Sequence, residues 1–175
     1  MNFFALFGFE EAFDIDLSRL SNTYKSLAQV THPDKFSQAS DSEKLMAVQK
    51  SAQVNDGYQV LKHPLSRAEH LLSIRGIQLS HETKTLQDPA FLMQQMEWRE
   101  QLEDVEHAAD QEAALETLDK ELQQHSQAQY IELQSLLEVN SDESDIQAAD
   151  QIRKLKFMEK LHHEIELKED ALFDE

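Results

Sequence analysis

Apolar residues recur at steps of three and four along the first third of the chain, which is the period of an amphipathic helix. The first such series is Leu17, Leu20, Tyr24 and Leu27. Asp16, just before this series, is a good N-cap because its carboxylate can accept hydrogen bonds from the free N–H groups of the first turn. We expect the helix to end before Pro33, since the residue preceding a proline is pushed out of helical backbone space.

A second helix is predicted from about residue 43 to residue 62, after a loop that runs through Phe36 into a serine-rich stretch. One series of related positions along it is Leu45, Val48, Ala52, Asn55, Tyr58 or Gln59, and Lys62. Gly57 costs this helix about 1 kcal/mol relative to alanine, which indicates that another group approaches the backbone there. Pro64 ends the helix, and a shorter one is predicted from Leu65 to Arg75.

The first third is therefore predicted to be a pair of antiparallel helices with shorter flanking pieces. Its helical spacing also predicts core residues on both long helices. They are Tyr24, Leu27, Tyr58 and Leu61.

The rest of the sequence predicts a separate group of helices. Residues 77–87 lack a clear hydrophobic period and are interpreted as a linker. Three helices are expected after it, at about residues 88–107, 111–138 and 144–172. The connections between them are short, so neighbouring helices should be antiparallel and form a three-helix bundle. The predicted fold is all-α, with a helical hairpin in residues 1–76 and the bundle in residues 88–175.

The composition fits a globular protein and excludes several kinds of site. The chain has 175 residues, 40% of them hydrophobic and 29% charged, which allows one or two domains. It contains no cysteine, so it has no disulfide, thiolate metal site or cysteine nucleophile. The apolar stretch near the N-terminus has no basic flank and no run is long enough to span a bilayer, so we expect a cytoplasmic protein without membrane association.

Negative charge is concentrated in the second part of the chain, and the formal net charge is -18. Residues 1–76 hold 8 basic and 9 acidic side chains, whereas residues 77–175 hold 8 and 25. Such a field repels phosphates, which disfavours binding to nucleic acid. The asymmetry indicates two functional halves and a partner of the second half that carries basic residues.

The motif His32-Pro33-Asp34-Lys35 lies between the two helices of the predicted hairpin. Proline fixes its own backbone dihedral and holds His32 extended, so the turn should be stiff and the Asp34 carboxylate should point outward. A carboxylate held in this way can pair with an arginine of a partner through two parallel hydrogen bonds. A motif this short also fits a plain turn between helices, and neighbouring residues give no support to a metal-ligand or general-base role of His32.

Together with the sequences around it, this motif resembles a J-domain, the module through which co-chaperones stimulate DnaK-type ATPases. The resemblance covers residues 1 to about 75 and includes the preceding amphipathic helix. Three further segments are similar to the HscB branch, the co-chaperones dedicated to iron-sulfur cluster assembly: Asn2–Gly8, His63–Glu69 and Phe91–Met93. With these the similarity extends over the whole chain, and it implies a co-chaperone that is not an enzyme and holds no cofactor.

The resemblance implies that His32, Pro33 and Asp34 contact an HscA-like, DnaK-type chaperone and accelerate hydrolysis in a site that the co-chaperone never enters. In this family the helix before the motif offers basic residues to the chaperone. Here these residues are few, namely Arg19, Lys25 and, past the motif, Lys35. We therefore expect weaker electrostatic attraction to the chaperone than is usual in the family.

The helix predicted from Asp88 carries more apolar residues than a core stripe needs. At about 100° per residue, a narrow stripe contains Phe91, Trp98, Leu102 and Val105. Leu92, Met93 and Met96 fall on the flank and back of the helix, near acidic residues. Spacing alone favours a core position for such residues, although apolar side chains rimmed by carboxylates also suit a binding patch.

The resemblance to HscB-like proteins implies that these residues bind a client. The family's client is an IscU-type iron-sulfur scaffold protein, and the matching positions are Leu92, Met93, Met96, Glu97, Glu100, Asp104 and Phe157. Met96 and Asp104 stand where the family often has leucine and glutamate. Both changes are mild, and methionine in particular adapts readily to its neighbours.

Alternatives to the co-chaperone interpretation remain open, and the first to consider is a metal site in the bundle. Glu159 and His162 have the Glu-x-x-His spacing of di-iron bundles, but residues 104–107 are only an imperfect second copy of it. His162 and His163 are expected at the surface. The alternatives are a carboxylate metalloenzyme in the helical bundle, a J-protein with another client, and a purely structural acidic module.

Overall fold

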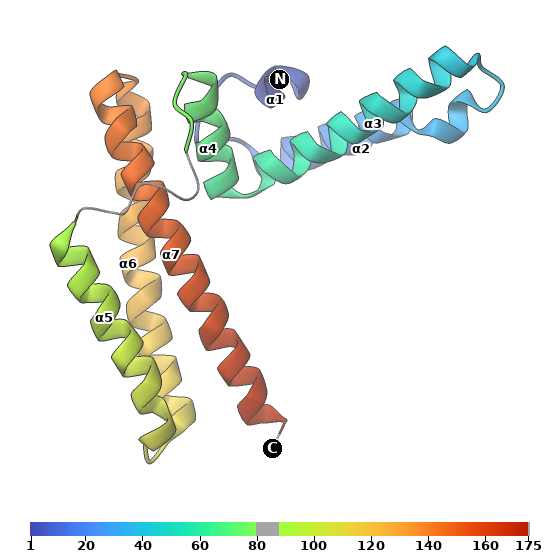
Figure 1. The fold of residues 1–175 in the computed structure, drawn as a ribbon. Coiled ribbons are helices and arrows are strands. Elements are labelled where there is room, and N and C mark those ends of the chain that lie inside the picture. Colours follow the sequence, from blue (N-terminus) through green and yellow to red (C-terminus); the bar gives the residue numbers. More distant parts are fainter. Residues whose placement is uncertain (80–87, 175) are drawn as a thin grey trace. The chain divides into compact units, whose positions relative to one another are not determined.

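The computed structural model describes residues 1–79 and 88–174, and every regular element within these ranges is a helix (Figure 1). The chain divides into two compact units, residues 1–78 and 79–175. The all-α prediction, with a helical hairpin followed by a three-helix bundle, is confirmed. The predicted linker, residues 77–87, falls mainly on residues 80–87, which lie outside the described residues.

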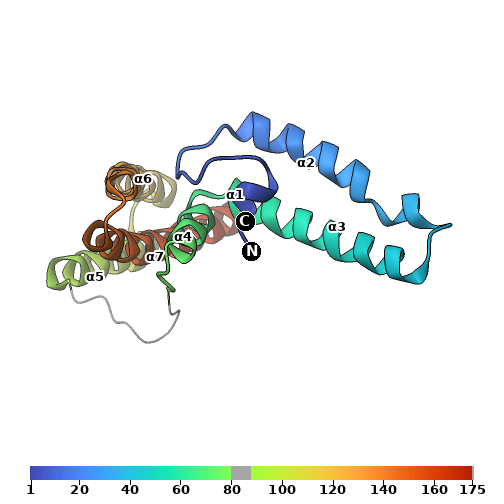
Figure 2. The same ribbon diagram turned by 90° about the horizontal axis from the view of Figure 1, so that it is seen from above.

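The first unit is built around an antiparallel pair of helices, α2 and α3, which lie side by side along their lengths (Figure 2). Its elements in chain order are α1 (Phe3–Leu6), α2 (Leu17–Thr31), the 3₁₀ turn η1 (Pro33–Phe36), α3 (Asp41–Lys62) and α4 (Pro64–Ile74). Asp16 caps α2 as predicted, by accepting from the N–H groups of Ser18 and Arg19. Helix α3 begins earlier than predicted because the Ser40 hydroxyl accepts from the N–H of Glu43 and caps it there.

The three prolines of the chain each begin a helical segment. Pro33 starts η1, Pro64 starts α4 and Pro89 starts α5. The first residue of a helix has no intrahelical partner for its N–H, so proline loses nothing there, and its fixed φ already suits the helix. Each proline therefore marks where a helical segment begins, and Pro33 and Pro64 also mark where the preceding helix ends.

The core of the first unit forms where α1 packs against α3. Phe4 and Phe7 of α1 are buried, and Gly57 of α3 lies directly beneath the aromatic rings. A methyl group added to Gly57 would lie 2.8 Å from Cε2 of Phe7 and 2.9 Å from Cδ1 of Phe3. The predicted close approach at Gly57 is thus confirmed, and the approaching groups are two phenylalanine rings.

The series predicted on α3 is not the buried face of the helix, since all of its members are exposed except Tyr58, which is partly buried. Leu45 and Val48 are more than half exposed, whereas the buried residues of α3 are Ala47, Val54, Gly57 and Leu61. Steps of seven residues from Ala47 through Val54 to Leu61 keep one narrow face toward the core. The expected core also needs correction: Leu61 is buried, but Tyr24, Leu27 and Tyr58 are only partly buried. The two tyrosine rings stack on each other, with centroids 4.1 Å apart.

Two polar side chains of α4 hold the N-terminal segment in place. The N–H of Phe3 donates to Nε2 of His70 at 3.0 Å, and burial lowers the pKa of His70, which keeps the ring neutral and able to accept. Arg67 is buried and donates to two backbone carbonyls, those of Phe13 at 2.6 Å and Leu61 at 2.8 Å. Segments far apart in the sequence are therefore joined at the base of the hairpin.

The second unit is an antiparallel bundle. Its elements are α5 (Pro89–Asp104), the 3₁₀ turn η2 (Val105–His107), α6 (Gln111–Val139) and α7 (Asp142–Phe173). The helices predicted at residues 88–107, 111–138 and 144–172 are confirmed with small shifts at their ends. The buried cluster at its centre comprises Phe91, Trp98, Leu102, Val105, Leu115, Leu118, Leu122, Met158, Leu161 and Ile165.

Helix α5 is tied to α7 by basic side chains. Lys154 of α7 donates to the Asp88 carboxylate at 2.8 Å and lies over the ring of Phe91. This hydrogen bond is the main reason why the pKa of Asp88 is lowered. Near the other end of α5, Lys168 donates to the carbonyl of Leu102 at 3.2 Å. Since this unit is strongly acidic, several of its few cations are engaged in holding α5 in place.

Substitution of Gly57 by valine should destabilise the protein by about 2–3 kcal/mol, because the added atoms collide with Phe3 and Phe7 in a packed core. The matched control is Ala52→Val at an exposed position of the same helix, where only helix propensity changes, by roughly 0.5 kcal/mol. Urea unfolding of both variants measures the difference. Equal stability of the two variants would show that α1 does not constrain α3 at this point.

Candidate functional site

The turn between α2 and α3 holds the predicted chaperone-binding motif, His32 to Lys35. His32 has an extended backbone (φ -60°, ψ 128°), and Pro33 begins η1 directly after it. The N–H of Asp34 donates to Nδ1 of His32 at 3.2 Å, so the imidazole caps the turn. The Asp34 side chain is 93% exposed, and its carboxylate lies 3.6 Å from Nδ1 of His32. The turn is therefore braced from within while its carboxylate faces solvent.

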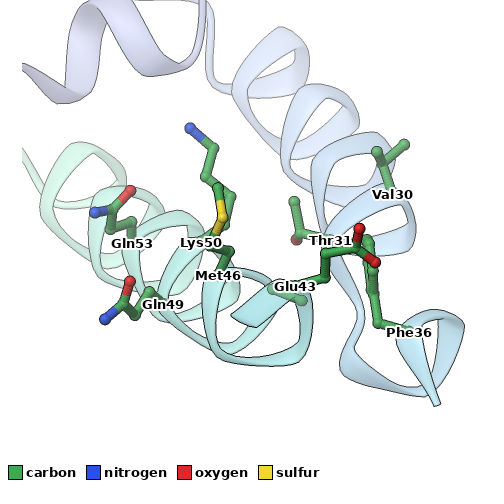
Figure 3. A pocket seen from close by; sticks show the side chains of 9 residues that line it. Val30, Thr31, Phe36, Glu43, Met46, Gln49, Lys50 and Gln53 are labelled. Carbon is green, nitrogen blue, oxygen red and sulfur yellow. The ribbon is translucent and has the colours of Figure 1, made fainter. Parts of the chain in front are cut away.

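An apolar groove lies beside this turn, between the C-terminal end of α2 and the N-terminal half of α3 (Figure 3). Its cavity is about 440 Å³, and Val30 and Phe36 face Met46 and Lys50 across it. Val30 and Met46 are each 65% exposed. This groove was not predicted from the sequence, although the apolar residues that lie outside the core stripes of both helices could have indicated it.

The predicted basic residues lie at different distances from the turn. Lys35 follows Asp34 directly, and Lys25 is exposed on α2 about two helical turns before His32. Arg19 is in the first turn of α2, roughly 20 Å along the helix from His32. Its guanidinium donates to the Gly8 carbonyl at 2.7 Å and lies over the ring of Phe9. The structure thus places residues 32–35 together in one turn, while Arg19 is engaged at the opposite end of the hairpin.

The residues predicted on the flank and back of α5 are exposed. The exposed fractions are 40% for Leu92, 65% for Met93 and 72% for Met96, whereas the four residues of the predicted core stripe are buried. The core position that helical spacing alone favoured for these three residues is therefore wrong. The reason is that α6 and α7 cover only one side of α5, and that side is already filled by Phe91, Trp98, Leu102 and Val105.

Phe157 of α7 lies between the core and the surface. Its ring packs edge-on against Phe91, with centroids 5.9 Å apart, and the guanidinium of Arg99 lies over it at 5.5 Å. The side chain also lines a cavity of about 570 Å³ together with Met96 and Glu100 of α5. The structure therefore joins three of the predicted client-binding residues in one cavity, and they come from two helices.

The remaining predicted carboxylates are spread around the outer surface of α5. Glu97, Glu100 and Asp104 are all exposed. Glu97 accepts from Nε2 of Gln94 at 3.2 Å. Asp104 lines a different cavity, of about 430 Å³, beside Val105. We call the set Leu92, Met93, Met96, Glu97, Glu100 and Asp104 the α5 outer face. It is a broad surface with apolar and acidic residues, and its members do not converge on one point.

The histidine and acidic residues that were considered as metal ligands do not form a site either. Within residues 1–79 and 88–174, no group of three or more histidine, aspartate or glutamate side chains could hold a metal ion. His163 is exposed, but the predicted surface position of His162 is wrong. Because α6 lies against α7, His162 is half-buried, with Nδ1 3.1 Å from Oδ1 of Asp119 and Nε2 3.4 Å from Oγ of Ser126.

No helix within the described ranges combines the length and the apolar content that crossing a bilayer requires. The candidate sites are the turn with its groove in the first unit, and the α5 outer face with Phe157 in the second.

Comparisons with known proteins cover almost the whole chain and agree on one family. A family model described as the HSCB C-terminal oligomerisation domain matches residues 87–166. The Co-chaperone protein HscB homolog of Pseudoalteromonas atlantica is 58% identical to this chain over 99% of each. Chaperone HscB from Vibrio cholerae has a similar structure, with a TM-score of 0.88, 47% identity, and 98% of this chain and 99% of that chain covered. Human co-chaperone protein HscB gives a TM-score of 0.87 at 29% identity, over 97% and 82% of the two chains. The chain therefore belongs to the HscB family of co-chaperones.

Proposed function

We propose that this co-chaperone stimulates the ATPase of a specialised, HscA-like DnaK-type chaperone and delivers an IscU-type iron-sulfur scaffold protein to it. The first unit is the J-domain that engages the chaperone, and the second unit binds the scaffold. The observation that carries the proposal is the exposed carboxylate of Asp34 on a turn braced by Pro33 and His32. Hydrolysis takes place in the chaperone, so this chain contributes binding and no catalytic chemistry.

The turn acts on the chaperone through a small number of strong contacts. The Asp34 carboxylate is free to accept two parallel hydrogen bonds from an arginine of the chaperone. The groove beside it offers Val30 and Met46 as apolar contacts at the same end of the hairpin. If these contacts are stronger when the chaperone is in its hydrolysing conformation, binding shifts the chaperone toward that conformation. The stimulation is then a coupling free energy between two sites on the chaperone.

The second unit offers a surface of a different kind. Apolar side chains on the α5 outer face are surrounded by carboxylates, and Phe157 adds an aromatic ring from α7. A surface of this kind suits a protein partner whose own patch combines apolar and basic residues. The strong negative charge of the second part of the chain attracts such a partner over a longer range.

Replacement of Asp34 by asparagine should lower the stimulation of the chaperone ATPase about tenfold or more, since a lost charge-assisted hydrogen bond costs roughly 1.5–3 kcal/mol. Helicity and thermal stability should not change, because the carboxylate is exposed. Single-turnover ATP hydrolysis measures the effect, with Asp56→Asn, exposed on α3, as the matched control. Full stimulation by the Asp34 variant would refute the role assigned to this carboxylate.

The double substitution of Leu92 and Met96 by alanine should weaken binding of the scaffold protein at least tenfold, because residues at the centre of an interface carry most of its affinity. Stability should fall by less than about 1 kcal/mol, since both side chains are substantially exposed. The matched control removes two equally exposed apolar side chains elsewhere in the bundle, Ile131 and Leu167. Isothermal titration calorimetry and thermal unfolding distinguish the outcomes, and a large loss of stability would mean that Leu92 and Met96 belong to the core.

A further inference from the structure

The cavity between α5 and α7 in the second unit is lined partly by residues that were not predicted to bind the client. It measures about 570 Å³ and is lined by Gln95, Met96, Arg99, Glu100, Glu103 and Phe157. Met96 and Phe157 supply an apolar wall from each helix, and the polar residues all come from α5. Glu103, Arg99 and Gln95 are not among the residues that the family resemblance assigns to client binding.

Among the described residues that line this cavity, the one cation, Arg99, is engaged within the molecule. Nη1 of Arg99 lies 2.5 Å from a carboxylate oxygen of Glu164 on α7. The same guanidinium covers one face of the Phe157 ring at 5.5 Å. Arg99 therefore fixes the aromatic wall of the cavity, and its charge is balanced by a carboxylate that lies outside the cavity lining.

The two carboxylates of the cavity, unlike Arg99, have no ion-pair partner among the described residues. Glu100 and Glu103 are both exposed, and no cation of the described residues lies within ion-pair distance of either one. The basic residues that α7 directs toward α5 act at its two ends, where Lys154 pairs with Asp88 and Lys168 reaches Leu102 and Glu106. Glu100 and Glu103, which lie in the C-terminal half of α5, thus retain uncompensated negative charge.

From these contacts we propose that the cavity receives one long basic side chain, lysine or arginine, from the scaffold protein. The aliphatic part of that side chain lies between Met96 and Phe157, and its charged end is bound by Glu100 and Glu103. Long basic side chains often bury their methylene groups on an apolar surface while their charge stays at a polar edge. The proposal rests on the proposed function and extends it, because it makes Glu103 a residue that selects for a basic partner.

The cavity is continuous with the α5 outer face, since Met96 and Glu100 belong to both. A partner that covers Leu92 and Met93 would therefore lie next to the cavity entrance. Charge complementarity favours a cation as the occupant over an apolar or acidic side chain, because the latter two would leave Glu100 and Glu103 facing an unfavourable neighbour.

The test is the dissociation constant for an IscU-type scaffold protein, measured by calorimetry at low and high salt. Glu103→Gln keeps the shape of the side chain and removes its charge, and we expect binding about three- to tenfold weaker at low salt with a smaller difference at high salt. The matched control is Glu132→Gln on α6, which is exposed and should bind as the unsubstituted protein does. Substitution of each surface lysine and arginine of the scaffold by alanine should reveal one whose effect disappears when Glu103 is glutamine.

The outcomes separate this proposal from the proposed function. If the unsubstituted protein binds the scaffold but Glu103→Gln behaves as Glu132→Gln does, the cavity proposal is overturned and the proposed function stands. If the unsubstituted protein does not bind the scaffold at all, both fail. Stimulation of the chaperone ATPase without scaffold should be the same for the Glu103 variant and the unsubstituted protein, because that activity belongs to the first unit.

Discussion

The first unit depends on the close approach of α1 to α3 at Gly57, where the rings of Phe3 and Phe7 lie against bare backbone. This contact, together with the buried Arg67 and the hydrogen bond from Phe3 to His70, fixes the base of the α2–α3 hairpin. The opposite end of the hairpin contributes little to the core, since Thr31 and Ala47 are its main buried residues. A rigid base allows the tip to expose Asp34 and the apolar groove without loss of order.

In the second unit, the contacts that hold α5 against α7 leave the outer face of α5 exposed. Lys154, Arg99 and Lys168 join α5 to α7 at three levels along their length. Two of these contacts are ion pairs, and the third is a hydrogen bond from Lys168 to the Leu102 carbonyl. The outer side of the same helix retains its carboxylates and exposed methionines, so the contacts that hold α5 in the bundle also leave its outer face free for a partner.

Much of this arrangement follows from the sequence because it depends on local rules. The Asp16 cap, the helix ends before Pro33 and Pro64, and the core stripe from Phe91 to Val105 are all set by residues near one another in the chain. A glycine inside a helical pattern also indicated a close approach at position 57, but not that Phe3 and Phe7 make it. What the sequence did not predict depends on how one helix is rotated against another. The exposure of Leu45 and Val48 is one example, and the half-burial of His162 between two helices is another.

The candidate sites show the same division. The outward direction of the Asp34 side chain was predictable, because Pro33 fixes its own backbone dihedral and holds His32 in an extended conformation. The cavity beside Phe157 was not, since it requires Arg99 to meet Glu164 across 65 residues of sequence. No periodicity within α5 or α7 reports that contact. Surfaces formed by one turn or one helix face are therefore visible in the sequence, whereas those formed between helices need the structure.

The central claim is that one chain links a chaperone, through its first unit, to a scaffold protein, through its second. The most direct test is single-turnover ATP hydrolysis by the chaperone with the scaffold present and the co-chaperone at limiting concentration. An equimolar mixture of Asp34→Asn and Leu92→Ala/Met96→Ala contains both intact surfaces, but on different chains. The account predicts that this mixture lacks the additional stimulation that the scaffold produces with the unsubstituted protein. Full stimulation by the mixture would contradict it, because the two surfaces would then act without being joined.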